Sequence, residues 1–552
     1  MTVSLTVNGD VVEVADESAS LLAVLREQLG LTSVKDGCSP QGQCGCCTVL
    51  VDGAARVACV TPVRRVRDRS ITTVEGLDDE TREAWAAAFC AAGASQCGFC
   101  TPGIILRLDA VLVKGDGASP SRDQVDRALA AHLCRCTGWN TIADAVEARI
   151  GAGAEIGAAS SRDFDAASER ATIEGHAPQR VDLTVPLGQG GFADDGAPAG
   201  ALVAVPDAAG GWAVGETLAG ARLAAGKVQG RRTTVDARPP IEVPAGDWDL
   251  VLQTSWVEPA YLETDASWCE PGGEPSTPLA NGGAFGAKVS SPVQAAARML
   301  ADEHGRAVRV LLSREDVVRL GPKRPPLAAG VRRDGTGVVH VARTAGISDA
   351  IRACAPGLEV HEVDLVGPPT DVGVRAAGWA EAAVLTSVLE AQREGAPLGG
   401  QALDAGPAIV RAPNGARAEA SVRADGTIAV RVACGDPLDE VVLRSYCIGA
   451  AHMALSWVTS EAIAVDAEGA VQDLTIRSFG IVRASDMPRV EVTIDADGGG
   501  PASAATGSRD PLVPAPPVNG SDAVFAAVAA AVWMHQGCPP VWPTSVPLSR
   551  IT

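Results

Sequence analysis

Aromatic residues are scarce in this chain of 552 residues, at 3% of the total, with only two tyrosines. The hydrophobic cores must therefore be built mainly from Ala, Val, Leu and Ile. Basic residues are also outnumbered, 46 against 67 acidic ones, which leaves a formal net charge of −21. A surface this acidic repels phosphate backbones and anionic lipid, so neither nucleic acid nor a membrane is expected as the main partner.

Long apolar segments and targeting signals are missing as well. The longest apolar run, Ala523 to Met534, is shorter than the roughly 20 residues that a transmembrane helix needs. The amino-terminal segment MTVSLTVNGD has neither the basic nor the apolar part of a signal peptide. The seven histidines show no HExxH spacing, and no GxSxG motif occurs. The sequence therefore predicts a cytoplasmic protein without these metalloprotease or hydrolase signatures.

Cysteine, by contrast, is abundant and unevenly distributed. Ten of the 15 cysteines lie before residue 137, and five are scattered over the remainder. In a cytoplasmic chain, cysteines in such number indicate metal or redox chemistry rather than disulfides. The chemistry of this protein is therefore expected in its first quarter.

The pattern of residues divides the chain into four parts and predicts an α+β multidomain protein. Residues 1–78 predict a small α+β domain, with strands at 3–7, 11–14, 49–51, 56–60 and 71–74 and one helix over 21–29. Residues 79–150 predict a bundle of four short helices, at 80–92, 103–113, 122–132 and 141–149. Residues 151–180, rich in Ala, Gly and Ser, predict a linker, and 181–552 predict a mixed α/β region.

The first cysteine set, Cys38, Cys44, Cys47 and Cys59, has the spacing Cys-x5-Cys-x2-Cys-x11-Cys. Four thiolates from one glycine-rich loop and the following hairpin can converge on a [2Fe–2S] cluster, and the glycines let backbone N–H groups point at the sulfurs. The alternative is a zinc site with four cysteine ligands, which usually come as two CxxC-like pairs. The single long loop favours iron–sulfur. Cys46, a fifth thiol in the loop, is interpreted as a bystander.

The second set, Cys97, Cys100, Cys134 and Cys136, consists of two close pairs, each near a predicted helix start. Helix amino termini favour anionic thiolates and anionic clusters. Zinc is again the alternative, although Cys-x-Cys suits tetrahedral zinc less well than Cys-x2-Cys. Cys90 lies nearby and is interpreted as a buried thiol on a helix.

In combination, GCSPQGQCGCCTVLVDG at 37–53, QCGFCTPG at 96–103 and LCRCTG at 133–138 resemble the iron–sulfur region of the molybdenum hydroxylases, the xanthine dehydrogenase and aldehyde oxidoreductase family. The resemblance covers about residues 1–150. It implies a β-grasp [2Fe–2S] ferredoxin domain followed by a four-helix [2Fe–2S] domain, with the two cysteine sets as cluster ligands. It also implies that Gln96 and Cys136 touch the pterin of a molybdenum cofactor. The first gap has five residues where the family has four, and Cys46 stands where Ala is common.

Residues 181–552 resemble an abbreviated form of the family's molybdenum-binding subunit. GGAFGAK at 282–288 is similar to its glycine-rich pterin loop, with Phe285 and Gly286 at matching positions. The segment VGPPTDVGVRAAGWAEA at 366–382 also matches and places Arg375 at the position of an arginine that contacts the cofactor. These three residues are therefore candidates for cofactor binding.

Several family features are missing from this second region. The resemblance leads us to expect a Gly-Gln-Gly cofactor loop after Gly435, but Asp436-Pro437-Leu438 follows. The family's Gly-Glu-Pro-Pro-Leu, which supplies the catalytic base, is replaced by a segment with Arg509 at the glutamate position and Asp510 next to it. Arginine cannot accept a proton at neutral pH. No catalytic residue is therefore assigned, and residues 181–552 are expected to fold without catalysing hydroxylation.

The leading hypothesis is an electron-transfer component of a molybdenum hydroxylase, which passes electrons through two [2Fe–2S] clusters to a flavin partner. No segment resembles a flavin domain, so the FAD is expected on a separate flavoprotein subunit, with a full-length molybdenum subunit as a further partner. Two alternatives remain open. One is a compact but complete molybdenum hydroxylase, and the other is a metal-binding protein without redox turnover.

Overall fold

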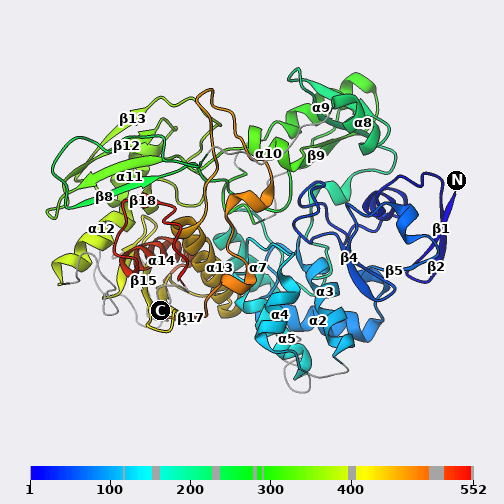
Figure 1. Ribbon diagram of the computed structural model, residues 1–552, viewed down its shortest axis with the longest axis horizontal. Coiled ribbons are helices and arrows are strands. Elements are labelled where there is room, and N and C mark those ends of the chain that lie inside the picture. The colour runs from blue at the N-terminus through cyan, green and yellow to red at the C-terminus, as the bar shows by residue number, and fades with distance from the viewer. Residues whose placement is uncertain are drawn as a thin grey trace.

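The computed structural model describes residues 2–115, 119–151, 162–226, 236–277, 283–288, 291–395, 406–495 and 515–548. The expected catalytic-base position, Arg509 with Asp510, lies outside the described residues, as does Gly282 of the glycine-rich loop. The structure shows the predicted α+β multidomain architecture, with a blue-to-cyan part and a green-to-red part that lie side by side (Figure 1).

The amino-terminal domain is built on a five-stranded sheet of order β2-β1-β5-β3-β4. Its strands are β1 Val3–Val7, β2 Asp10–Val14, β3 Thr48–Val51, β4 Ala54–Val57 and β5 Ser70–Thr72. Ser20 caps helix α1, Leu21–Ala23, which continues as the π-helix η1, Val24–Gln28. The parallel pairing of β1 with β5, flanked by two antiparallel hairpins, agrees with the predicted β-grasp fold.

The next domain consists of four helices, in the intervals that the sequence predicts. They are α2 Asp79–Ala92, α3 Thr101–Lys114, α4 Arg122–Leu129 and α5 Asn140–Ile150. Asp78 caps α2, a Ser121–Gln124 capping box begins α4, and Pro102 stands in the first turn of α3. These local signals explain why the sequence located the helices well.

The remainder of the chain forms three sheets covered by helices. The first, of order β7-β6-β10-β9, has the strands β6 Leu202–Pro206, β7 Trp212–Gly215, β9 Ala266–Cys269 and β10 Val308–Leu311. The second, β13-β12-β11-β8-β18, has β8 Leu250–Thr254, β11 Leu327–Val331, β12 Gly337–Ala342, β13 Leu358–Val363 and β18 Val541–Trp542. The third, β14-β15-β16-β17, has β14 Ala408–Arg411, β15 Arg417–Val422, β16 Ile428–Ala433 and β17 Val490–Ile494.

The helices of this region are α8 Leu218–Ala225, α9 Val293–His304, α10 Arg314–Leu320, α11 Ile347–Cys354, α12 Trp379–Arg393, α13 Glu440–Thr459 and α14 Ser521–His535. Short 3₁₀ turns are η2 Val63–Val66, η3 Val74–Gly76, η4 Ala193–Gly196, η5 Ile476–Phe479 and η6 Ala484–Asp486.

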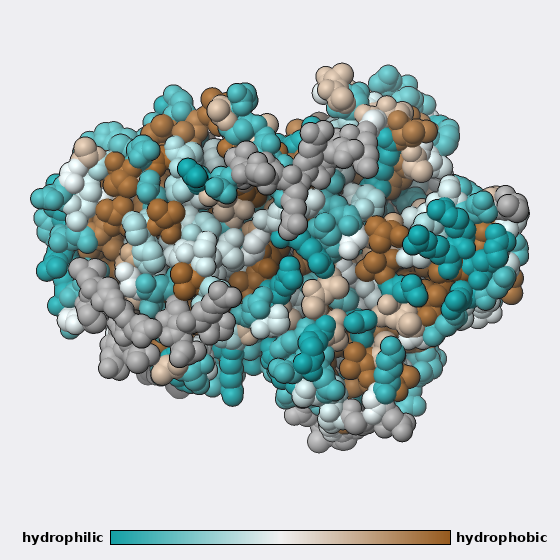
Figure 2. All heavy atoms as spheres, viewed as in Figure 1, coloured by the Kyte–Doolittle hydropathy of each residue, from teal (hydrophilic) through white to brown (hydrophobic). Residues whose placement is uncertain are grey.

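Helices α13 and α14 form the centre of the carboxy-terminal half. Every residue of α14 is buried, which explains its continuous apolar sequence. By length and composition α13 could cross a bilayer, but 89% of its most apolar window is buried inside this fold, as in a core helix of a folded domain. On the face in Figure 2, apolar residues gather in several separate groups among polar ones.

The segment predicted as a linker, 151–180, contains a packed helix. Helix α7, Phe164–Gly175, begins at the Asp163 cap, and its Arg170 and Glu174 are completely buried. The segment is rich in Ala and Ser, and the helix has little amphipathic pattern of its own. For these two reasons the sequence suggested a linker. Its burial depends instead on segments far along the chain, which are described below.

Candidate iron–sulfur centres and the adjoining cavity

The first cysteine set is buried between the sheet and α3. Cys38, Cys44 and Cys47 lie in the loop between η1 and β3, and Cys59 follows β4. The thiol of Cys38 contacts those of Cys44 and Cys59, and the thiol of Cys59 also contacts that of Cys47. The loop and the hairpin therefore bring the four predicted ligands together.

Backbone N–H groups point at these sulfurs, as the glycine-rich loop predicts. The amides of Gln41 and Gln43 donate to Sγ of Cys38 at 3.3 and 3.4 Å, and the amide of Cys59 donates to Sγ of Cys47 at 3.4 Å. Such donors stabilise thiolates and tune the potential of a cluster that they hold.

The second set lies where α3 begins and where α4 and α5 are joined. Sγ of Cys97 is 3.6 Å from Sγ of Cys136, and the thiols of Cys100 and Cys134 are in contact. This contact, with a 3.1 Å hydrogen bond between Cys134 and Thr137, lowers the pKa of Cys134 to about 6. The arrangement is two sulfur pairs; among the described residues no group of three or more His, Cys, Asp or Glu side chains surrounds a single metal position.

Two further cysteines belong to different surroundings. Cys46 is buried in the first-set loop, and its thiol contacts that of Cys44. Cys90 is buried on α2 and donates to the carbonyl oxygen of Asp182 at 3.3 Å, and burial raises its pKa to about 12. Cys90 is therefore a buried helix thiol, as expected, whereas Cys46 is a close neighbour of the predicted ligands.

The two cysteine sets belong to domains that touch directly. A Cβ on Gly103 of α3 would lie 2.5 Å from the carbonyl oxygen of Gly45, and a Cβ on Gly45, whose φ is +76°, would lie 2.5 Å from the ring of His132. Nε2 of His132 lies 3.2 Å from Oγ1 of Thr48, and burial lowers the pKa of this histidine to about 4. Glycine at both positions permits the close approach of the first-set loop to α3 and to His132.

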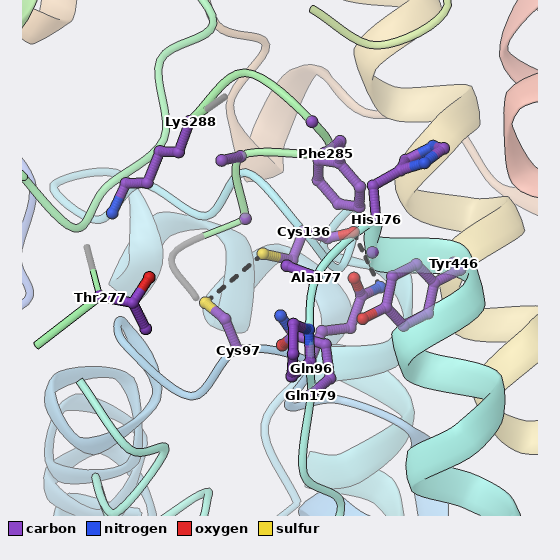
Figure 3. Close-up of a pocket in the computed structure, with 15 residues that line it drawn as sticks. Gln96, Cys97, Cys136, His176, Ala177, Gln179, Thr277, Phe285, Lys288 and Tyr446 are labelled. Carbon is purple, nitrogen blue, oxygen red and sulfur yellow. Dashed lines mark hydrogen bonds between the residues drawn. The ribbon is translucent and has the colours of Figure 1, made fainter. Parts of the chain in front are cut away.

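A cavity of about 430 Å³ adjoins the second set (Figure 3). Gln96, Cys97 and Cys136 form one wall, and Phe285 and Lys288 lie on other sides. Nε2 of Gln96 donates to the carbonyl oxygen of Cys136 at 3.0 Å, while its buried Oε1 has no hydrogen-bond partner among the described residues.

The glycine-rich loop lies against this wall, as the sequence predicts. Gly283 has φ +70°, and a Cβ there would collide with Sγ of Cys136. Phe285 packs edge to face on Tyr446, with ring centroids 6.0 Å apart, and Gly286 lies beside it at the cavity. The loop thus brings residues of the carboxy-terminal half against a predicted cluster ligand.

Arg375, the third cofactor candidate, is not among the residues that line the cavity. Its guanidinium lies 4.3 Å from the ring centroid of Phe285, pairs with Asp522 at 3.2 Å and donates to Ser521 at 2.9 Å. Asp522 also binds His176 at 2.7 Å. Internal partners therefore occupy the arginine, and the described lining of the cavity contains no Asp or Glu.

Helix α7 holds the segment Asp436-Pro437-Leu438, which stands where the family resemblance leads us to expect a Gly-Gln-Gly cofactor loop. The Arg170 guanidinium donates to the carbonyl oxygens of Asp436 and Pro437. Glu174, one turn later, accepts hydrogen bonds from the amides of Gly520 and Ser521 at the start of α14. Sequence reasoning missed this helix, although Asp163 as a cap and the Arg170–Glu174 spacing were signals for it.

The carboxy-terminal half also holds both cysteine loops. Arg314 of α10 donates to the carbonyl oxygen of Gly37 at 2.8 Å, next to Cys38. Arg135, between Cys134 and Cys136, forms a buried ion pair with Glu461. Both loops are therefore anchored by residues more than 200 positions away.

Comparison with known proteins gives a match over the first quarter of the chain. Residues 73–147 match the family model of the [2Fe-2S] binding domain. The nicotinate dehydrogenase small FeS subunit of Eubacterium barkeri is 39% identical over 148 residues, which are 26% of this chain and 92% of that subunit. The aldehyde oxidoreductase of Megalodesulfovibrio gigas is 44% identical over 147 residues, which are 16% of its length.

The fold comparison extends over the whole chain. The crystal structure of the aldehyde oxidoreductase from Desulfovibrio desulfuricans matches with a TM-score of 0.65 at 16% identity, covering 96% of this chain and 97% of that one. At this identity the likeness concerns the fold alone. The carboxy-terminal region thus has the fold that its weak motifs suggested.

Proposed function

Because this chain belongs to the xanthine dehydrogenase and aldehyde oxidoreductase family of molybdenum hydroxylases, which are oxidoreductases, we propose that it is an electron-transfer component with two [2Fe–2S] clusters. The observation that carries the proposal is the pairing of eight buried cysteine thiols in two sets whose loops touch at Gly45 and Gly103. When bound, each cluster supplies a one-electron redox centre.

The chain's own residues hold and shield these centres. The eight thiolates are the ligands, and the amides at Gln41, Gln43 and Cys59 stabilise their negative charge. All eight side chains are buried, so water is kept from the sulfurs. Arg314 and the Arg135–Glu461 pair fix the loops against the carboxy-terminal half, which supports a structural role for that half.

The second set, next to the 430 Å³ cavity, would hold the cluster nearer to a redox partner bound there, and the flavin acceptor in this proposal belongs to a separate flavoprotein subunit. The matched relatives include subunits whose names describe parts of larger enzymes, such as the nicotinate dehydrogenase small FeS subunit. A full-length molybdenum subunit is a further partner in this proposal. Co-purification of the tagged chain, followed by flavin analysis of the complex, tests it.

The cavity suits the pterin part of a molybdenum cofactor, a group that supplies hydroxylation chemistry when bound. The loop from Gly283 to Gly286 would lie along the heterocycle, opposite the wall formed by Gln96, Cys97 and Cys136. The described lining offers no carboxylate to accept a proton, and Arg375 is paired with Asp522. We therefore propose that residues 181–552 do not catalyse hydroxylation.

Metal and sulfide analysis of the purified full chain tests the iron–sulfur assignment. We expect about four iron atoms and four acid-labile sulfides per chain, and two distinct paramagnetic signals after reduction, because the two ligand sets have different surroundings. Stoichiometric zinc without iron would contradict the proposal and support a metal-binding protein without redox turnover.

Expression with molybdenum cofactor supply tests the second region. Pterin retention should fall in Gln96→Ala and stay unchanged in the control Gln253→Ala, whose amide likewise donates to a backbone carbonyl but lies on β8, outside the cavity. Turnover of purines or aldehydes by the molybdenum-loaded chain, lost in Asp510→Asn, would contradict the non-catalytic proposal. That result would support the alternative of a compact, complete hydroxylase.

A further inference from the structure

A second cavity, of about 590 Å³, lies between the ferredoxin domain and the lobe that carries α8 and α9. Figure 1 shows this green lobe beside the blue domain. Apolar side chains from both sides contribute to its walls: Leu22 and Ala23 from α1, Leu218 from α8, Leu311 at the end of β10 and Leu312 after it. Its size is that of a site for a small organic molecule.

Two aromatic rings at this cavity connect it to the cysteine loops. Phe99 and Phe192 both line it and pack edge to face, with centroids 5.1 Å apart. Cε1 of Phe99 would lie 3.2 Å from a Cβ on Gly37, the residue before Cys38, and Phe99 itself precedes Cys100 in sequence. A ligand on these rings would therefore lie beside loops of both cysteine sets.

Polar groups are concentrated near the first-set loop. Arg222 of α8 donates to Oγ of Ser39 at 2.7 Å and approaches Asp36 at 3.7 Å. Oδ1 of Asp36 is buried and has no hydrogen-bond partner among the described residues. The other acidic residues at the cavity include Asp194 and Asp195, which pair with basic neighbours. The lining thus contains two guanidinium groups, of which Arg26 is held by Asp194 and Asp195, while Arg222 lies beside the first-set loop.

We propose that this cavity binds a neutral, planar aromatic electron acceptor of the quinone class, which the adjacent cluster reduces. The apolar walls and Phe99 fit a flat ring, and Arg222 can donate to a carbonyl oxygen. The six acidic residues of the lining disfavour phosphate-bearing acceptors such as dinucleotides, since their charges repel phosphate.

The reaction balances as a two-electron reduction. Two electrons, delivered one at a time by the reduced clusters, and two protons from water convert the two C=O groups of the quinone into C–OH groups, while the clusters are oxidised. The supply of electrons depends on the proposed function. Binding of the quinone to the oxidised chain does not depend on the proposed function. The two proposals can therefore fail separately.

Menadione, a naphthoquinone without phosphate or charge, is a suitable probe for the full iron–sulfur-loaded chain. Equilibrium dialysis with the oxidised chain should give one binding site. Stopped-flow mixing of dithionite-reduced chain with menadione should give cluster reoxidation that saturates with menadione concentration. Leu218→Trp, which fills the cavity, should lower both the affinity and the reoxidation rate at least tenfold.

The control is Leu223→Trp on the same helix, because Leu223 is 85% exposed and outside the cavity. It should bind menadione and be reoxidised like the unmodified chain. If Leu218→Trp does not fold, as judged by circular dichroism, Ala219→Phe at the cavity replaces it. Absence of menadione binding, or binding and reoxidation that the cavity variants leave unchanged, would overturn the proposal. A chain that binds menadione but contains no clusters would contradict the proposed function instead.

Discussion

The two regions of this chain, residues 1–150 and residues 181–552, use buried polar groups in different ways. In residues 1–150, buried thiols face one another in pairs, with backbone N–H groups directed at several of their sulfurs. In residues 181–552, buried charged groups neutralise one another, as in the pair of Arg375 with Asp522. The difference teaches that the buried thiols of residues 1–150 face one another, as cluster ligands must, whereas Arg375 and Asp522 of residues 181–552 pair with each other inside the fold.

The largest effect is expected on the iron content, which depends on cysteines in residues 1–150 and not on residues 181–552. Cys134→Ser should remove one of two paramagnetic signals and about half of the iron, because this variant lacks one thiolate of the second set only. Electron paramagnetic resonance and iron analysis of the reduced variant check this. Loss of both signals would show that the two sets are not independent sites.

The second prediction concerns a buried charge of the carboxy-terminal half. Arg375→Ala should destabilise the protein by about 3–5 kcal/mol, because the buried carboxylate of Asp522 loses its arginine partner and keeps His176 as its ion-pair partner among the described residues. Urea unfolding measures the change, and both paramagnetic signals should persist in the folded variant. Arg343→Ala, which breaks an exposed pair with Asp364, is the control and should leave the unfolding midpoint unchanged. Equal urea unfolding midpoints for Arg375→Ala and Arg343→Ala would show that the buried pair of Arg375 with Asp522 does not stabilise the fold more than an exposed pair does.

The third prediction concerns pH. Burial lowers the pKa of His132, beside the first set, and of His452, in α13, from 6.5 to about 4. Both histidines are therefore neutral in the folded chain and take up protons on unfolding at pH values between about 4 and 6.5. Their contribution to stability is fully present above pH 6.5 and is lost as the pH falls toward 4, by about 2 kcal/mol each between pH 8 and pH 5.

Unfolding midpoints in urea at pH 8, 7, 6 and 5 test this linkage. His452→Gln should flatten the dependence without changing either paramagnetic signal, because Nε2 of His452 bonds only to the backbone oxygen of Val482. His132→Gln should flatten it too, and should also perturb the first signal because His132 packs on Gly45. If the urea midpoint falls with pH to the same extent in the unmodified chain, His452→Gln and His132→Gln, these histidines do not cause the loss of stability at low pH.

The smallest effect is expected at Cys46. Cys46→Ala should leave the iron content and both signals unchanged, because the other four thiols of the first region complete a ligand set. The variant is also the matched control for Cys134→Ser. If Cys46→Ala abolishes the first signal, Cys46 is a ligand, and one of the four predicted ones is not.

Much of the first half could be predicted because its signals are local. The helix predicted at 80–92 is observed at Asp79–Ala92, since Asp78 caps its start and Gly93 ends it in a left-handed conformation. The position of Phe285 and Gly286 at a cavity also followed from a motif. By contrast, α7 was taken for a linker. The contact of Arg375 with a cofactor stays a prediction, and its pairing with Asp522 and Ser521 of α14 could not be read from the sequence.

The sequence by itself determined which residues could bind metal, since thiol spacing and glycine placement are properties of short segments. Only the tertiary structure decided what surrounds them. It brought Gly103 against Gly45, and it buried α7 by joining Arg170 to Asp436 and Pro437. These contacts link residues far apart in the chain, and their energy arises only when the segments exclude water from one another. No local pattern therefore encodes them.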